Sequence, residues 1–154
     1  MPLIQPLTID EIYISPFRER RAKDEYGRLQ WVPNEPNLHP TGQRHVDALI
    51  QSYASGNADA GSIAKMFGCK REDIWAMVRI LTGMDIREFR HAYGFRLADD
   101  LLRYTSLSID RIANRSGFIC ASLLCQQYLK YYKCTPAERR SQLRHGSDLG
   151  LYRL

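Results

Sequence analysis

The chain has 154 residues, of which 44% are hydrophobic and 25% charged, a composition typical of one globular domain with a buried core. Its net charge of +5 is uneven, because residues 91–154 hold ten Lys and Arg against five Asp and Glu. A basic segment attracts polyanions such as nucleic acids. No run approaches the roughly 18 apolar residues of a membrane span, and the N-terminus lacks the pattern of a secretory signal, so we expect a cytoplasmic protein without a membrane partner.

The cysteines and histidines form no motif. Cys120 and Cys125 lie about 140° apart around a helix, so they would not share a face, and no C-x-x-C pair occurs. The four histidines have no partner at catalytic or metal-binding spacing, and no glycine-rich phosphate loop is present. We therefore predict no metal, no cofactor and no enzymatic activity.

Residues 1–38 are expected to form an arm and a linker. The runs EIYI (residues 11–14) and LQWV (residues 29–32) are β-prone, and Gly27 suits a turn between them. Three prolines in residues 32–40 exclude a helix there. Because an isolated hairpin is marginally stable, we expect a loose hairpin that packs on the rest of the chain or on a second copy, which would allow self-association through the arm.

Helical periodicity begins near Thr41. Val46, Leu49, Ile50 and Tyr53 recur at i, i+3, i+4 and i+7, which indicates one buried stripe. Capping and stop residues predict helices from about 41 to 54, from 59 (with Asp59 as the cap) to 67, from 71 to 81 and from 86 to 104. Three short helices then begin at Ser108, after Gly117 and at Pro136. The tail, residues 146–154, is expected to fray.

An internal repeat relates the two halves of the helical region. Residues 63–68 and 112–117 share the pattern I-A-x-x-x-G, and each copy is followed by an amphipathic helix. Two short helices around a glycine turn are typical of a helix-turn-helix unit. The sequence thus predicts an all-α fold with two helix-turn-helix subdomains, joined by the long linker helix at residues 86–104 and preceded by the arm.

The C-terminal motif resembles a known family. Leu101-Leu102-x-x-Thr105-x-Leu107-Ser108-Ile109-x-x-Ile112-Ala113-x-x-x-Gly117-Phe118, followed by Tyr131-Tyr132-x-Cys134-Thr135-Pro136-x-Glu138-x-Arg140, is similar to the signature of AraC/XylS-type transcription regulators. The similarity covers about residues 40–145. It implies an AraC-type DNA-binding domain at residues 39–145, between the arm (1–38) and the tail (146–154).

The resemblance implies that the protein binds double-stranded DNA through two recognition helices in successive major-groove segments. Base-facing candidates carried over from the family are Glu72, Asp73, Trp75 and Ala76 in the first unit, and Ala121, Ser122, Leu123, Cys125 and Gln126 in the second. Candidates for phosphate contacts are the basic residues of the last third, Arg111, Arg115, Lys130, Lys133, Arg139, Arg140 and Arg144.

Several positions depart from the family pattern. Ala76 and Gln126 stand where the family usually has arginine, as does Gly94 in the linker helix, and Leu129 stands where lysine is common. Two functions remain open. In one, the module reads DNA with different preferences, with Gln126 contacting adenine. In the other, it has lost operator specificity and binds RNA polymerase or another regulator, through an apolar patch of Trp75, Leu123 and Leu129.

Overall fold

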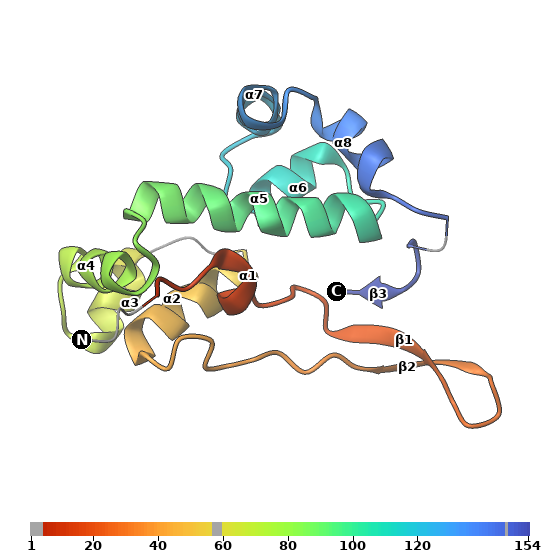
Figure 1. Cartoon of the computed structure of the whole chain (residues 1–154), viewed down its shortest axis with the longest axis horizontal. Coiled ribbons are helices and arrows are strands. Elements are labelled where there is room, and N and C mark those ends of the chain that lie inside the picture. The colour runs from red at the N-terminus through yellow and green to blue at the C-terminus, as the bar shows by residue number, and fades with distance from the viewer. Residues whose placement is uncertain (1–4, 57–59, 147) are drawn as a thin grey trace.

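The computed structural model describes residues 5–56, 60–146 and 148–154. Two three-helix units flank the long helix α5 (Ile86–Tyr104) (Figure 1). The first unit contains α2 (Arg44–Ala54), α3 (Ala60–Phe67) and α4 (Arg71–Thr82); the second contains α6 (Ile109–Arg115), α7 (Ala121–Tyr132) and α8 (Pro136–Leu143). The predicted fold of two helix-turn-helix units on a linker helix is confirmed.

Local signals account for the helix ends. The side chains of Asp85, Ser108 and Thr135 each accept a hydrogen bond from the backbone three residues later, and so cap α5, α6 and α8. Gly83 ends α4 in the left-handed conformation, with φ 73°. The predicted cap Asp59 lies outside the described residues.

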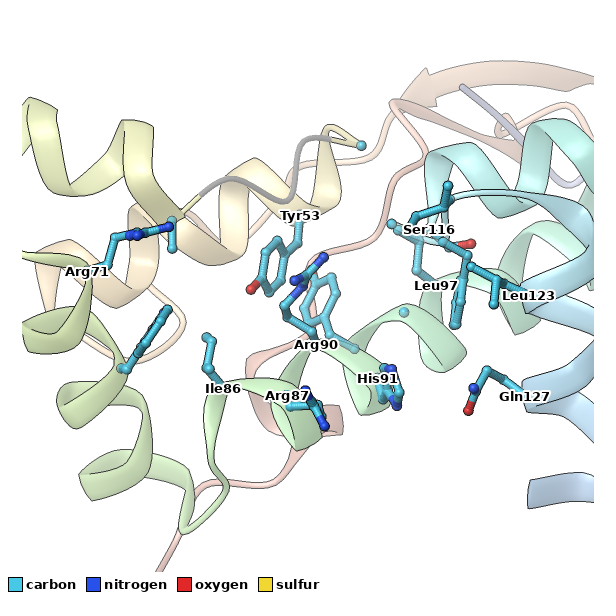
Figure 2. A pocket seen from close by; sticks show the side chains of 18 residues that line it. Tyr53, Arg71, Ile86, Arg87, Arg90, His91, Leu97, Ser116, Leu123 and Gln127 are labelled. Atoms are coloured by element: carbon cyan, nitrogen blue, oxygen red, sulfur yellow. The ribbon is translucent and has the colours of Figure 1, made fainter. Parts of the chain in front are cut away.

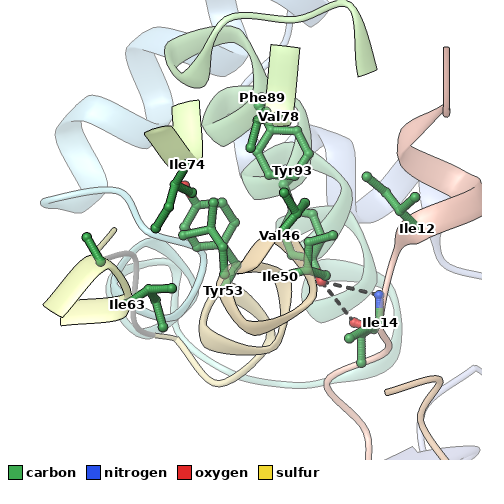
Figure 3. Close-up of a cluster of buried hydrophobic side chains, with 12 residues drawn as sticks. Ile12, Ile14, Val46, Ile50, Tyr53, Ile63, Ile74, Val78, Phe89 and Tyr93 are labelled. Carbon is green, nitrogen blue, oxygen red and sulfur yellow. Dashed lines mark hydrogen bonds between the residues drawn. The ribbon is translucent and has the colours of Figure 1, made fainter. Parts of the chain in front are cut away.

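Helix α5 contributes to the cores of both units. Its N-terminal half buries Phe89 and Tyr93 against the predicted stripe of α2, as Figure 3 shows, together with Ile63 of α3 and Ile74 and Val78 of α4. Its C-terminal half packs against α6 and α7 in a second core. The buried residues of this core include Leu97, Ala98, Leu101 and Leu102 of α5, Ile112 and Ala113 of α6, and Leu124 and Tyr128 of α7. Because one continuous helix belongs to both cores, the spacing of the two units is set by its length.

The start of the arm differs from the prediction. The β-prone run EIYI does not form a strand. Its first half belongs to α1 (Ile9–Ile12), and the two residues that follow, Tyr13 and Ile14, lie outside any helix or strand. Thr8 and Glu11 form a reciprocal capping box that holds this single helical turn, with the Thr8 backbone N–H 2.7 Å from the Glu11 carboxylate. This local polar pairing overrides the β propensity of the run.

The hairpin forms with one of its two expected strands: the run LQWV becomes a strand as predicted, but its partner is not EIYI. β1 (Glu19–Lys23), which lies in the polar stretch, pairs antiparallel with β2 (Leu29–Pro33), and Gly27 occupies the turn with φ 78°. The expected fraying of the tail is also wrong, because β3 (Tyr152–Arg153) pairs with the other edge of β1. The Arg153 and Arg21 guanidinium groups lie over the Trp31 ring, so cation–π contacts add to this three-stranded sheet.

The arm packs on the helical body, as predicted. Ile12 and Ile14 are buried in the first core, whereas Phe17 is buried in the second, beside Tyr104 and Tyr152. The Tyr93 hydroxyl donates to the Ile14 carbonyl and accepts from the Ile14 backbone N–H (Figure 3). Burial raises the pKa of Tyr93 to about 12, so this hydroxyl stays protonated at neutral pH. The six-residue segment from Ile12 to Phe17 therefore packs into the cores of both units.

Gly94 permits the close approach of α5 to the turn between α6 and α7. A Cβ atom at this position would lie 2.8 Å from the Ser116 carbonyl oxygen and 3.1 Å from the Phe118 ring. The arginine that is common here in the family could not occupy this position without a shift of that turn. The departure at Gly94 is therefore a packing feature of this chain.

We expect Gly94→Ala to lower the free energy of unfolding by up to about 2 kcal/mol, because an overpacking cost of about 1–3 kcal/mol is offset in part by a gain of about 1 kcal/mol in helix propensity. Urea denaturation would measure the change. Gly146→Ala is the control, because a Cβ there meets nothing within 4 Å. A Gly94→Ala variant that is more stable than the wild type, as helix propensity alone would make it, would contradict the close contact.

Candidate nucleic-acid interface

Helix α4 presents the first set of base-facing candidates. Glu72 and Ala76 are exposed one turn apart, and Trp75 is half-buried beside them. Asp73 is also exposed, but its carboxylate accepts a hydrogen bond of 3.0 Å from the Lys70 backbone N–H. Of the two carboxylates at this helix start, Asp73 thus stabilises the helix, whereas Glu72 is left to face a ligand.

Helix α7 presents the second set. Ser122 and Gln126 are exposed one turn apart, while Ala121, Leu123 and Cys125 are half-buried. The opposite face is fixed by burial of Leu124 and Tyr128, whose hydroxyl donates to the Asp99 carboxylate at 2.8 Å. All nine base-facing candidates lie on α4 or α7 as the helical spacing implies, with Ser122, Gln126, Glu72, Asp73 and Ala76 the most accessible.

A cleft of about 470 Å³ lies between α4 and α7. In Figure 2, Arg71 of α4 comes from one side, Leu123 and Gln127 of α7 from the other, and Arg87, Arg90 and His91 of α5 lie between them. The structure thus brings Trp75 and Leu123, two of the predicted residues, to the walls of the same cleft.

The cleft is electropositive. Its three arginines are Arg71, Arg87 and Arg90, and none of the lining residues that the structure describes is acidic. Within the same described residues, none of these arginines forms an ion pair. The Arg71 guanidinium lies 5.9 Å from the Trp75 ring centroid. Cations that lack internal partners are available to an anionic ligand.

Two polar atoms at the cleft have no partner in the described part of the chain. They are Trp75 Nε1 and Gln127 Oε1, each buried from solvent as an atom. A buried polar group without a hydrogen bond costs about 1–3 kcal/mol. A hydrogen bond to an ordered water would satisfy either atom.

His91 responds to the charge of this region. Burial lowers its pKa, and the cations Arg90, Arg87 and Lys130 lower it further. Its ring stacks near Phe118 with the centroids 6.2 Å apart. An anion in the cleft would oppose the effect of these cations and raise the pKa of His91.

The sequence-based site missed Arg71, Arg87 and Arg90. Arg87, Arg90 and His91 are spaced at i, i+3 and i+4, which places them on one face of the predicted linker helix. That spacing was a usable signal. The spacing does not tell which part of the fold this face points toward, because that depends on how α5 packs against both units.

Three of the predicted phosphate contacts are engaged within the fold. Arg139 makes two hydrogen bonds to the Asp99 carboxylate, at 2.9 and 3.3 Å. Arg140 donates to the carbonyls of Leu102 and Leu107, and Arg144 donates to those of Leu102, Arg103 and Thr105. Two of these carbonyls, those of Leu102 and Arg103, belong to the last turn of α5, where carbonyl groups have no partner within the helix. These side chains hold α8 against α5, and this role accounts for them.

The structure shows no internal hydrogen bond from the side chains of the other four phosphate candidates within the described residues, and three of the four are exposed. Arg111, Lys130 and Lys133 are exposed, and Lys133 ends α7 with φ 60°. Arg115 is half-buried, and its Nε atom has no hydrogen-bond partner within the residues that the structure describes. Its backbone lies beside Gly56, so it also marks a contact between the two units.

The described residues hold no candidate metal site and no membrane-spanning helix. No group of three or more His, Cys, Asp or Glu in them could hold a metal ion, and the cysteines range from the exposed Cys120 to the buried Cys134. Among the helices of these residues, none is long and apolar enough to cross a membrane.

Comparison with known proteins identifies the family. A family model described as a helix-turn-helix domain, of the AraC type, matches residues 63–142, more than half of the chain. The protein therefore belongs to the AraC-type helix-turn-helix family. No curated protein matches the chain.

Solved structures share the fold. The C-terminal domain of the two-component response regulator yesN from Fusobacterium nucleatum aligns at 20% identity over 62% of this chain and 93% of that one, with a TM-score of 0.53. The C-terminal domain of AraT, a response regulator from Geobacillus stearothermophilus, aligns at 18% over 72% and 92%, with a TM-score of 0.59. The DNA-binding domain of the global transcriptional factor AdpA, solved with a target DNA, aligns at 20% over 64% and 90%, with a TM-score of 0.54.

Proposed function

We propose that the protein is a sequence-specific, DNA-binding transcription regulator that places α4 and α7 in successive major-groove segments of one duplex. The observation that carries this proposal is the cleft between those helices, where three arginines form no ion pair with any described residue and no described lining residue is acidic. Family membership supports it, as does the fold shared with a domain solved on DNA. Residues 39–145 would form the DNA-binding module, between the arm and the tail.

Base reading would fall to the most exposed polar side chains of the two helices. Gln126 can make two hydrogen bonds to adenine, and Glu72 can accept from the amino group of cytosine. Ser122 can donate or accept, and Ala76 and Ala121 can contact thymine methyl groups. Neutral groups at positions 76 and 126 leave more of the electrostatic affinity to residues outside the recognition helices.

Phosphate contacts would come from cations at the cleft and around α7. We assign them to Arg71, Arg87 and Arg90, together with the exposed members of the predicted set, Arg111, Lys130 and Lys133, and the half-buried Arg115. Arg139, Arg140 and Arg144 are left out of this assignment because their guanidinium groups already bind internal acceptors.

Titration of the protein with duplexes of mixed sequence tests this function. We expect binding at about 50 mM salt that weakens steeply by about 200 mM, because each neutralised phosphate releases condensed counterions. On a selected operator, Gln126→Ala should lose about 1–3 kcal/mol at one A·T position and keep its non-specific affinity.

Absence of binding at 50 mM salt would contradict the proposal. It would favour the alternative of a protein-interaction module, for which Leu129, 49% exposed on α7, offers an apolar contact. Leu129→Asp should then abolish association with RNA polymerase or another regulator, whereas under the DNA-binding proposal that association is not required.

A further inference from the structure

The cleft between α4, α5 and α7 has the properties of a small-molecule site as well as a charged surface. Its volume of about 470 Å³ lies within the range of about 300–1,000 Å³ that is typical of ligand pockets. Much of its wall is apolar or aromatic, contributed by Tyr53, Trp75, Ile86, Leu97, Phe118 and Leu123. A surface that contacts only phosphates would not need such walls, because phosphate contacts are polar.

The polar groups of the cleft select for an anion. Arg71 stands on the α4 side, and Arg87 and Arg90 stand on α5, so positive charge surrounds the space from two elements (Figure 2). An arginine fork matches a carboxylate through two parallel hydrogen bonds. No described lining residue carries an opposing negative charge.

We propose that this cleft binds a small organic carboxylate with an apolar or aromatic body, and that such a ligand excludes DNA. The carboxylate pairs with the cleft arginines while the body packs against Trp75, Phe118 and Leu123. Binding is a property of the protein alone, whereas its regulatory consequence rests on the proposed DNA-binding function. The two ligands compete because both use Arg87 and Arg90, and because the small molecule fills the space between the recognition helices.

Direct binding can be measured without DNA. The chain has two tryptophans, so the full-length Trp31→Phe variant leaves Trp75, inside the cleft, as its fluorescent reporter. We expect saturable changes in its emission on titration with 4-phenylbutyrate or octanoate. The neutral 4-phenylbutan-1-ol should bind at least tenfold more weakly, since it keeps the apolar body and lacks the charge.

Variants test the assigned residues. In the same Trp31→Phe background, Arg87→Gln/Arg90→Gln should weaken 4-phenylbutyrate binding at least tenfold. Arg20→Gln/Lys23→Gln removes the same charge from the exposed hairpin and should leave binding unchanged. No saturable change with either carboxylate, or equal affinity for the alcohol, would overturn the proposal.

Competition separates this proposal from the DNA-binding function. If the protein binds duplex DNA and 4-phenylbutyrate displaces it, both stand. If DNA binds and neither carboxylate does, the ligand site is overturned and the function is untouched. If 4-phenylbutyrate binds to a protein that has no affinity for DNA, the cleft is a ligand site and the DNA-binding function falls. If both bind without competition, the regulatory half of the proposal is wrong.

Discussion

Phe17→Ala is expected to lower the free energy of unfolding by about 3–5 kcal/mol, the usual effect of removing a buried aromatic ring. Phe17 is only 3% exposed, although it belongs to the N-terminal arm. Its ring stacks on Tyr152 at 5.1 Å and meets the edge of Tyr104 at 5.9 Å. Its loss would open a cavity that the second core, the start of β1 and the end of the chain all border. Urea denaturation of the full chain measures this effect.

Leu29→Ala is the matched control within the same hairpin. Leu29 is 55% exposed on β2, so its truncation should change stability by no more than about 0.5 kcal/mol. A Phe17→Ala variant within about 1 kcal/mol of the wild type would show that the arm docks loosely.

The position of the arm in both cores also leads us to expect that the two units unfold together. Ile12 belongs to the first core and Phe17 to the second, so the same short segment would have to leave both cores. We therefore expect one cooperative transition, and in the Trp31→Phe background Phe17→Ala should shift the transitions seen by circular dichroism and by Trp75 fluorescence together.

Arg87→Gln/Arg90→Gln is expected to weaken binding to all duplexes by roughly 60-fold at about 0.1 M salt and to make the salt slope shallower by about 1.8, on the basis of about 0.9 per phosphate contact. Both side chains are exposed on α5, line the cleft and form no ion pair within the described chain. Their removal should therefore affect electrostatic affinity and leave the fold intact. Fluorescence anisotropy with duplexes of different sequence, at several salt concentrations, measures both quantities.

The hairpin provides the control of equal charge. Arg20 and Lys23 are exposed on β1, which lies at the opposite end of the molecule's long axis from α4 (Figure 1). Arg20→Gln/Lys23→Gln also removes two positive charges. It should change affinity by less than about threefold, because only phosphates that the protein contacts release counterions. Equal losses for the two double variants would indicate that net charge alone attracts DNA and that the cleft is not the interface.

Local patterns determined the helical architecture. The stripe of α2 is buried as predicted because residues at i, i+3, i+4 and i+7 share a face of any helix, whatever packs against it. Asp85, Ser108 and Thr135 cap their helices through contacts only three residues long, which the sequence displays directly. The repeat around residues 63–68 and 112–117 and the C-terminal motif likewise identified the two units and their family before any packing was known.

Contacts between distant segments required the tertiary structure. Strand β3 pairs with β1 across more than 130 residues. Neither strand has a sequence pattern that predicts this pairing. Arg140 and Arg144 resemble solvent-exposed cations in the sequence, yet they bind carbonyls at the end of α5 about 40 residues away. The cleft is a similar case. Helical spacing placed Arg87 and Arg90 on one face of α5, but only the docking of α4 and α7 on either side of that face brought them together with Arg71, Trp75 and Gln127.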